Sequence, residues 1–449
     1  MVFLKLKNLK NKLLHFINSK NLFKKKDKIL VTISGGLDSV VLTYLLHSLN
    51  FNITLAHCNF NLRAKESDKD EEFVKKLADK LNIKLYIKQF DTKQFAEENS
   101  YSIEEAARIL RYNWFEKIRN ENSLDYIATA HHLDDKIETF FINITAGTGI
   151  RGIRSIQTKN EKIVRPILFA KRKDIELWAS KNNIKHRTDQ SNFNTKYTRN
   201  KFRHNILPHF KELNPAFEET MSKNFEIFSN IEKIYNNYIA SASIKVVSQK
   251  DGLIYINLKA LLKEITPETL LFEIIKYFGF NYSQTLDILR FKDKMQTGKS
   301  FISKKYKLIK DRNNLIISKI TNLTKDIFYI EENQTEINTP ISLKITKSVI
   351  DKNFKIKKDK NIAYFDANKI KFPLKLRTKK NGDIFHPFGM KGKKLISDYF
   401  TDIKLNTFEK ENAILLLSEE NIIWISGHRT DDRYKITNKT KNVLIIQMQ

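Results

Sequence analysis

One stretch of the sequence decides the fold class: Lys28-Ile-Leu-Val-Thr-Ile-Ser-Gly-Gly-Leu-Asp-Ser-Val-Val-Leu-Thr-Tyr-Leu-Leu46. It begins with an apolar, β-branched run at 29–33, which is typical of a buried strand. A Gly-rich turn follows, and then a strongly apolar segment that opens with Asp38 and Ser39, two residues that favour helix N-caps. The stretch therefore predicts a strand, a tight turn and a helix.

The turn between this strand and helix has the features of a polyphosphate-binding loop. Successive backbone N–H groups beside a helix N-terminus form a cradle for phosphate oxygens, and Gly35 and Gly36 allow close approach of the main chain. Hydroxyls at Ser34 and Ser39 can donate hydrogen bonds, and Asp38 can hold a divalent cation that bridges the phosphates. The loop has neither the lysine of a Walker A sequence nor the spacing of a dinucleotide-binding loop. A Gly-rich turn without a ligand is the alternative.

Apolar strand-like runs alternate with helical periodicity over the first part of the chain. The strands are predicted at 29–33, 53–57, 84–88 and 125–130, and the helices at 39–49, 68–81, 103–118 and 134–144. Such alternation predicts an α/β fold with a doubly wound, Rossmann-like parallel sheet. Since ligands bind at the carboxyl ends of parallel strands, the Ser34–Ser39 loop and the segments after His57 and Ala130 are expected to face one crevice.

A second polar cluster follows the predicted strand at 125–130, in the run His131-His132-Leu133-Asp134-Asp135-Lys136-Ile137-Glu138-Thr139. Imidazoles and carboxylates at a strand end suit the handling of Mg²⁺ or phosphate. Asp134 or Asp135 can instead simply cap the helix, and both interpretations stay open here. A zinc site is not favoured, because no thiolate accompanies these residues.

The regular alternation of strands and helices ends after the first domain, which is expected to span 1–212. Residues 213–322 are expected to form a mostly helical domain, with a hairpin signal at Lys250-Asp251-Gly252. A polar stretch at 321–340 is expected to be a linker. Residues 323–449 are expected to comprise that linker and a small α/β domain with a helix near 395–403.

Charge and composition narrow the class of partner. The formal net charge of +29, from 80 Lys and Arg against 51 Asp and Glu, favours a nucleic acid, although lysines on solvated faces could account for part of it. Cys58 is the single cysteine, which excludes an internal disulfide and a C-x-x-C site. No apolar run has the length of a membrane span and no signal peptide is evident, so no membrane partner and a cytoplasmic location are expected.

Ser34-Gly35-Gly36-Leu37-Asp38-Ser39 resembles the PP-loop of ATP pyrophosphatases, and with further segments the chain resembles the tRNA(Ile)-lysidine synthetase family. These segments are Phe60-Asn61-Leu62-Arg63 with Glu66-Ser67, 104–112, 131–139, 147–152, 165–168, 189–192, 197–204, 381–395, 427–429 and 432–435. The resemblance implies that ATP adenylates C2 of the wobble cytidine of an isoleucine tRNA and that free L-lysine then displaces AMP, giving lysidine. ATP and Mg²⁺ are the implied cofactors.

The resemblance also implies roles for particular residues. The loop residues Ser34, Gly35, Gly36, Leu37, Asp38 and Ser39 are expected to hold the pyrophosphate of ATP. Asp38 and Asp134 are the expected Mg²⁺ ligands, and Asp134 or Asp135 could orient the lysine ammonium and take its proton. His131, Arg111 and Arg203 are expected to contact the α-phosphate or the adenylate.

Basic residues are expected to contact the tRNA, with rings such as Phe388 and Tyr434 near some of them. The candidates are Arg199, Arg377, Lys391, Lys393, Lys394, Arg429 and Arg433. The sequence leaves the oligomeric state open, with a homodimer as one option. The alternatives are another PP-loop enzyme that modifies tRNA, such as a cytidine thiolase, which would need cysteines to carry sulfur, and a non-catalytic RNA-binding protein with an ATP fold.

Overall fold

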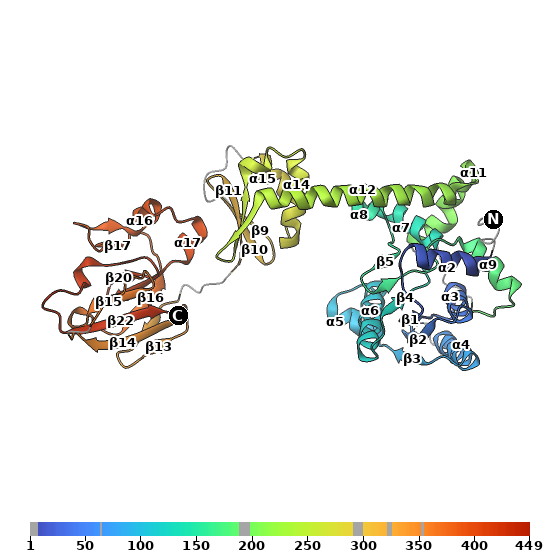
Figure 1. Ribbon diagram of the computed structural model, residues 1–449, viewed down its shortest axis with the longest axis horizontal. Coiled ribbons are helices and arrows are strands. Elements are labelled where there is room, and N and C mark those ends of the chain that lie inside the picture. Colours follow the sequence, from blue (N-terminus) through green and yellow to red (C-terminus); the bar gives the residue numbers. More distant parts are fainter. Residues whose placement is uncertain (1–7, 63–64, 188–197, 291–299, 321–325, 352–353) are drawn as a thin grey trace. The chain divides into compact units, whose positions relative to one another are not determined.

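The computed structural model describes residues 8–62, 65–187, 198–290, 300–320, 326–351 and 354–449 of the chain (Figure 1). The chain divides into two compact units, Met1–Asn236 and Asn237–Gln449. Among the sequence motifs, Arg63, the run 189–192 and Tyr197 lie outside the described residues.

The first unit is built on a six-stranded sheet with the order β3-β2-β1-β4-β6-β5. Its strands are β1 (Lys28–Thr32), β2 (Asn52–Asn59), β3 (Leu85–Gln89), β4 (Tyr126–Ala128), β5 (Lys159–Asn160) and β6 (Ile163–Val164). Every neighbouring pair is parallel except β5 with β6. The chain order reverses beside β1, which pairs with β2 on one side and β4 on the other. The predicted doubly wound parallel sheet is confirmed.

Helices cover both faces of this sheet because successive side chains of β1 point to opposite sides. Ile29 and Val31 pack with α2 (Leu9–Ser19), α3 (Leu37–Ser48), α4 (Lys65–Leu81) and α9 (Arg172–Lys181). Leu30 packs on the other face with α6 (Ile103–Glu121), which follows α5 (Thr92–Asn99). Figure 1 shows the two helical layers on either side of the strands. The apolar, β-branched character of β1 follows from this burial on both faces.

The two helices that begin at the sheet edge start differently from the sequence prediction. The N-cap of α3 is Gly36, so the prediction that Asp38 or Ser39 caps this helix is wrong, and both lie in its first turn. The N-cap of α7 (Leu133–Ala146) is His132, whose backbone N–H donates to Asp135 Oδ2 at 3.0 Å. Asp135 therefore completes a capping box from the third helical position, and Asp134 does not cap.

The remaining helices of the first unit surround α7. They are α8 (Ile150–Ile153), α10 (Thr198–Lys201), the π-helix η2 (Phe202–Ile206), α11 (Leu207–Leu213) and the start of α12 (Phe217–Val246). Ile137 and Phe140 of α7 pack against Phe217 and Phe225 of α12. α12 runs for 30 residues, and the boundary between the two units falls inside it. No helix in the described part of the chain combines the length and apolar character of a membrane span.

The segment after α12 adds a five-stranded antiparallel sheet to the predicted helices. Its strands are β7 (Val247–Lys250), β8 (Leu253–Asn257), β9 (Ser300–Ile302), β10 (Tyr306–Asp311) and β11 (Asn314–Lys319), and its helices are α13 (Leu258–Leu261), α14 (Pro267–Ile275) and α15 (Tyr282–Arg290). The hairpin at Asp251-Gly252 is confirmed. Residues 300–309 contribute to two strands, β9 and β10, that pair with each other.

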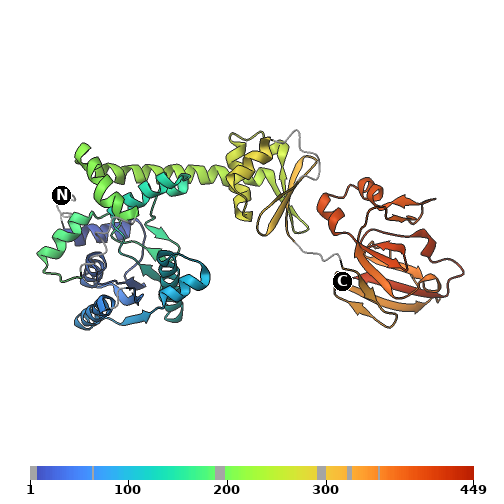
Figure 2. The ribbon, with the colours of Figure 1, turned by 180° about the vertical axis from the view of Figure 1, so that it is seen from behind.

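The C-terminal region is built from two antiparallel sheets, coloured orange to red in Figure 1 and seen from behind in Figure 2. One contains β12 (Phe328–Ile330), β16 (Leu374–Thr378), β19 (Ile414–Ser418), β20 (Asn421–Ile425) and β21 (Arg429–Thr430); the other contains β13 (Glu336–Ile337), β14 (Leu343–Val349), β15 (Ile362–Asp366) and β22 (Asn442–Met448). Phe365 and Trp424 share the core between the sheets. Because β12 and β13 lie within 321–340, the prediction that this whole stretch is a linker is wrong.

A third layer covers the outer face of the sheet that contains β19. Leu415 and Leu417 of that strand pack against Phe400 of α16 (Ile396–Asp402) and against Phe385 of the two-stranded ribbon formed by β17 (Ile384–Phe385) and β18 (Lys394–Leu395). The short helix α17 (Thr407–Asn412) follows. The predicted helix near 395–403 is confirmed.

The core beneath the phosphate loop depends on fully buried side chains of α3. Leu42 has no exposed surface, so Leu42→Ala should lower the free energy of unfolding by about 2–5 kcal/mol. Leu177→Ala on α9 is the matched control: Leu177 is 51% exposed and should cost less than about 0.5 kcal/mol. Amide hydrogen exchange of peptides covering 29–49 measures both effects. Equal exchange rates in the two variants would contradict this packing.

Candidate active site

The loop after β1 is held in shape by its own polar groups. Ser39 Oγ accepts from the backbone N–H of Ser34 at 3.2 Å and donates to the carbonyl of Gly36 at 2.9 Å. Ser34 Oγ accepts from the backbone N–H of Gly36 at 3.3 Å. Gly35 has a φ of +89°, a conformation that L side chains rarely adopt. The loop therefore requires glycine at position 35.

A distant residue, Arg187, fastens the loop to α4. Its backbone N–H donates to the carbonyl of Gly35 at 3.0 Å, and its guanidinium contacts Glu66 and Asp70 at 2.7 and 2.9 Å. The side chain of Leu37 packs in the core beneath the loop. Leu37 can therefore offer a ligand only its backbone, whereas the hydroxyls of Ser34 and Ser39 lie at the cavity.

The loop and the start of α7 line one cavity of about 1270 Å³. The residues predicted from the sequence that line it are Ser34, Gly36, Asp38, Ser39, Arg111, His131, Asp134, Asp135, Arg199 and Arg203. Topology brings them together, because β1 and β4 are parallel neighbours and both chains leave the sheet at the same edge. The predicted crevice is thereby confirmed for the segments that follow β1 and β4.

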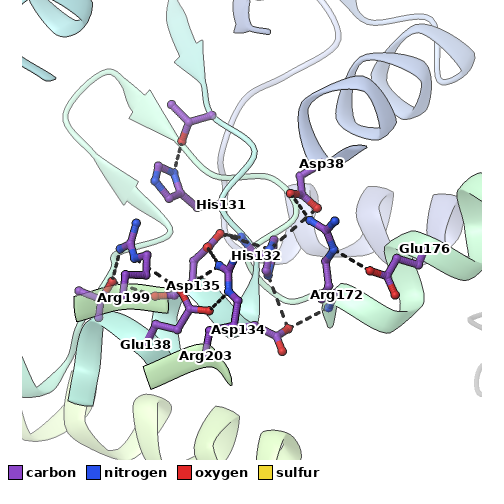
Figure 3. A network of polar contacts seen from close by, with 12 residues as sticks. Asp38, His131, His132, Asp134, Asp135, Glu138, Arg172, Glu176, Arg199 and Arg203 are labelled. Atoms are coloured by element: carbon purple, nitrogen blue, oxygen red, sulfur yellow. Dashed lines mark hydrogen bonds and ion pairs between the residues drawn. The ribbon is translucent and has the colours of Figure 1, made fainter. Parts of the chain in front are cut away.

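Two adjacent histidines at the end of β4 differ in protonation state at neutral pH. The imidazole of His132 lies 3.5 Å from oxygens of Asp134 and Asp135 and 3.9 Å from Asp38 Oδ1 (Figure 3). Burial disfavours its charge, but these carboxylates outweigh burial and raise the pKa of His132 to about 9. Burial lowers the pKa of His131 to about 4, and its Nδ1 lies 2.8 Å from Thr129 Oγ1. At neutral pH His132 is therefore charged and His131 neutral.

A buried carboxylate that the sequence prediction left without a role organises the two arginines of the next segment. Glu138 is fully buried and accepts from Arg203 Nε at 2.6 Å and Nη2 at 3.0 Å. Arg203 Nη2 also lies 3.3 Å from Asp135 Oδ1, and Arg199 Nε lies 3.5 Å from Glu138. Arg199 and Arg203, four residues apart, therefore both face Glu138. The sequence contained a signal for Glu138, because it lies one helical turn after Asp135 and so shares a face of the helix with it.

Two cations from later segments neutralise the carboxylates predicted to bind a metal ion. Arg172 Nη1 lies 2.5 Å from Asp38 Oδ2, and the backbone N–H of Arg172 donates to Asp134 Oδ2 at 2.8 Å. Lys211 Nζ lies 3.5 Å from Asp134 and 2.7 Å from Glu218. Burial raises the pKa of Asp38; at Asp134, His132 and these donors outweigh burial and lower the pKa. No local sequence signal connects Arg172 with Asp38, since 134 residues separate them.

The opposite wall of the cavity is aromatic. Its residues are Phe60, Tyr112 and Phe115, with Cys58 beside them, and the guanidinium of Arg111 lies 5.0 Å from the ring centroid of Phe60. Such a wall can stack on a nucleobase. Burial raises the pKa of Cys58 to about 12, so its thiol is not reactive at neutral pH. The wall therefore favours base binding and offers no sulfur carrier.

The C-terminal candidates for tRNA binding fall into two groups. Three of the basic side chains pair within the fold: Arg377 binds Asp383 through two contacts of 2.8 Å, Arg433 binds the buried Asp431 through two of 3.0 Å, and Lys394 pairs with Asp402. The other three are Lys391, Lys393 and Arg429, which are exposed, as is the paired Arg433, and Arg429 hydrogen-bonds Tyr399. Arg377 is therefore the most enclosed of these pairs, with a side chain only 10% exposed, whereas Lys391 and Lys393 are accessible to a ligand.

Comparison with known proteins extends these observations. The segment 5–210 matches a family model described as PP-loop domain, 249–320 one described as TilS substrate binding domain, and 374–446 one described as TilS substrate C-terminal domain. The tRNA(Ile)-lysidine synthase of Parabacteroides distasonis is 41% identical over 96% of this chain and 98% of its own length. That of Bacteroides thetaiotaomicron is 39% identical over 98% of this chain and 100% of its own.

A solved U34-tRNA thiolase from Methanococcus maripaludis aligns with 49% of this chain and 78% of its own chain at 18% identity, with a TM-score of 0.39. The parallel sheet, its Gly-rich loop at the switch point and the match to the PP-loop model define an ATP-binding enzyme of the PP-loop class. Within that class, the near full-length relatives show that the chain belongs to the tRNA(Ile)-lysidine synthase family.

The different protonation states of the two histidines can be tested by NMR titration of the histidine-labelled, ligand-free protein. We expect His132 to titrate near pH 9 and His131 near pH 4. Because the pKa of folded His132 exceeds the ordinary value of 6.5, its charge contributes stability that is fully present below pH 6.5 and is lost as the pH rises to about 9. Two titrations close to 6.5 would contradict the arrangement.

The paired and exposed basic groups of the C-terminal region should respond differently to mutation. Arg377→Met removes the guanidinium from Asp383 and leaves it only the backbone N–H of Lys380; since both side chains are only 10% exposed, the variant should lose about 3 kcal/mol of stability. Lys393→Met at an exposed position should change stability by less than about 0.5 kcal/mol. Calorimetric unfolding of the full chain compares the two. An unchanged melting profile for Arg377→Met would show that this pair is not a structural contact.

Proposed function

We propose that this chain ligates free L-lysine to C2 of the wobble cytidine of an isoleucine tRNA in an ATP-dependent reaction that releases AMP and pyrophosphate. The observation that carries the proposal is the meeting of the Ser34–Ser39 loop with the polar start of α7 in one cavity. A phosphate cradle, carboxylates and an aromatic wall are the groups that adenylation of a base requires. Membership of the tRNA(Ile)-lysidine synthase family supports this assignment.

In the first step the C2 oxygen of cytidine attacks the α-phosphorus of ATP and pyrophosphate leaves. Backbone N–H groups of the loop, with Ser34 and Ser39, stabilise the charge that develops on the leaving group. Neutral His131, with Nδ1 facing the hydroxyl of Thr129, can present Nε2–H to an α-phosphate oxygen. Arg111 and Arg203 offer guanidinium groups for the remaining charge of the adenylate.

In the second step the neutral ε-amine of lysine attacks C2, forms the new C–N bond and displaces AMP, which retains the former C2 oxygen. The ammonium form has no lone pair, so a carboxylate must take its proton first. Asp135 is one candidate because it lines the cavity, although contacts with the charged Arg203 and His132 favour its ionised form and lower its pKa. Asp134 is the other candidate, although it is already paired with Lys211.

Mg²⁺ is the cation that this site fits. Asp38 Oδ1 is buried with no hydrogen-bond partner in the described structure, and Mg²⁺ is commonly held by one or two carboxylates together with substrate phosphates. The described residues contain no cluster of three or more potential metal ligands, which agrees with a cation brought in by the nucleotide. Asp38 and Asp134 would hold it, and it would neutralise phosphate charge.

We assign the three parts of the chain to catalysis and tRNA binding. Residues 1–212 form the proposed catalytic domain, 213–322 a tRNA- or substrate-binding domain, and 323–449 the linker and C-terminal tRNA-binding domain. The exposed Lys391, Lys393 and Arg429 supply the phosphate contacts proposed for the last part, with Arg199 a further candidate beside the catalytic cavity. A homodimer remains part of the proposal for the assembly.

The decisive experiment combines the purified chain, ATP, Mg²⁺, radiolabelled lysine and an isoleucine tRNA transcript with a wobble cytidine. We expect one lysine to be incorporated into the tRNA for each AMP and pyrophosphate released, and none with a wobble uridine. Asp38→Asn should abolish adenylation while leaving tRNA binding intact, because Asp38 faces the phosphates. Glu72→Gln, an equivalent change at an exposed position of α4, is the control. Formation of ADP, or no incorporation by folded protein, would refute the assignment.

A further inference from the structure

The phosphate loop of this chain lacks a cation of its own. A Walker A loop carries a lysine that reaches the outer phosphates, whereas Ser34-Gly35-Gly36-Leu37-Asp38-Ser39 contributes only backbone N–H groups, hydroxyls and one carboxylate. Pyrophosphate is a highly charged leaving group, and its departure is favoured by fixed positive charge. Any cationic side chain that acts beside Mg²⁺ at this loop must therefore come from another element of the fold.

Arg172 is the guanidinium that lies closest to the loop carboxylate. It is the first residue of α9, and its Nη1 lies 2.5 Å from Asp38 Oδ2 while its Nε lies 2.9 Å from Glu176 Oε1 (Figure 3). Its backbone is anchored separately, because its N–H donates to Asp134. The side chain is 39% exposed at the cavity wall. Because the backbone of Arg172 is anchored while its guanidinium is accessible, the guanidinium can exchange partners without movement of the helix.

We propose that Arg172 is stored against Asp38 when the site is empty and binds the β- and γ-phosphates when ATP enters. The inference rests on the proposed function of the cavity. In the empty site the guanidinium neutralises the same carboxylate that the cation would use. Entry of Mg²⁺ with ATP supplies Asp38 with a stronger partner, and the freed guanidinium gains phosphate oxygens that its planar fork can bind in pairs.

If Arg172 is stored on Asp38, Arg172→Gln should change the affinities for two ligands in opposite directions. Binding of inorganic pyrophosphate in the presence of Mg²⁺, measured by calorimetry, should weaken about ten- to a hundredfold, because a charge-assisted contact is lost. Binding of Mn²⁺ alone, measured by electron paramagnetic resonance, should become several-fold tighter, since Asp38 loses its competitor. If the Arg172–Asp38 ion pair is merely structural, Arg172→Gln should leave both affinities unchanged, or it should lower both affinities together with the melting temperature.

Two further variants make the test specific. Lys173→Gln removes a positive charge from an exposed neighbour in the same cavity wall, and it should shift both affinities much less than Arg172→Gln. Arg172→Lys keeps the charge without the fork and should bind pyrophosphate with intermediate affinity; it also serves if the glutamine variant fails to fold. Equal effects of Arg172→Gln and Lys173→Gln, or weaker Mn²⁺ binding, would overturn the proposal. Lysine and tRNA are absent from these measurements, so such a result would leave the ligation assay unaffected.

Discussion

The parallel pairing of β1 with β4 is the constraint on which the rest of the first unit depends. It places Val31 opposite Ala128, so the two chains leave the sheet side by side and turn into α3 and α7. One turn provides a phosphate cradle and the other provides imidazole and carboxylate groups. Neither is a site alone, because the cradle has no group to bind a base or an amine and the α7 start has no cradle.

Charge compensation is the second organising feature of the cavity. Asp38, Asp134, Asp135 and Glu138 approach one another at a buried helix start, which would be unfavourable if the carboxylates were unpaired. Cations from separate segments compensate these negative charges. They are His132, Arg172, Arg203 and Lys211. Each of these four carboxylates therefore has a cationic partner from the chain itself. Under the proposed function, a charged substrate would compete with these internal pairs for the same side chains.

The sequence predicted much of this because local patterns carried the information. The glycines and hydroxyls of Ser34–Ser39 indicated a phosphate-binding loop, and the alternation of strands and helices correctly indicated a parallel sheet. The sequence misplaced the cap of α3, since Asp38 has the residue type of a cap but the helix begins earlier, at Gly36. For α7 it left open whether Asp134 or Asp135 caps; the N-cap is His132, and Asp135 completes a capping box. It also could not separate Arg377, which is bound to Asp383, from exposed lysines, since composition does not report pairing.

The sequence by itself determined the class of chemistry, because residue types at short spacing specify a strand, a glycine turn and a helix N-terminus without reference to distant parts. The tertiary structure alone decided which distant side chains complete the site. The contact of Arg172 with Asp38, the attachment of Arg187 to Gly35 and the burial of Glu138 beneath Arg203 all join separate segments. No local pattern encodes such pairs, since they arise only when the packing of helices on the sheet brings their ends to one edge.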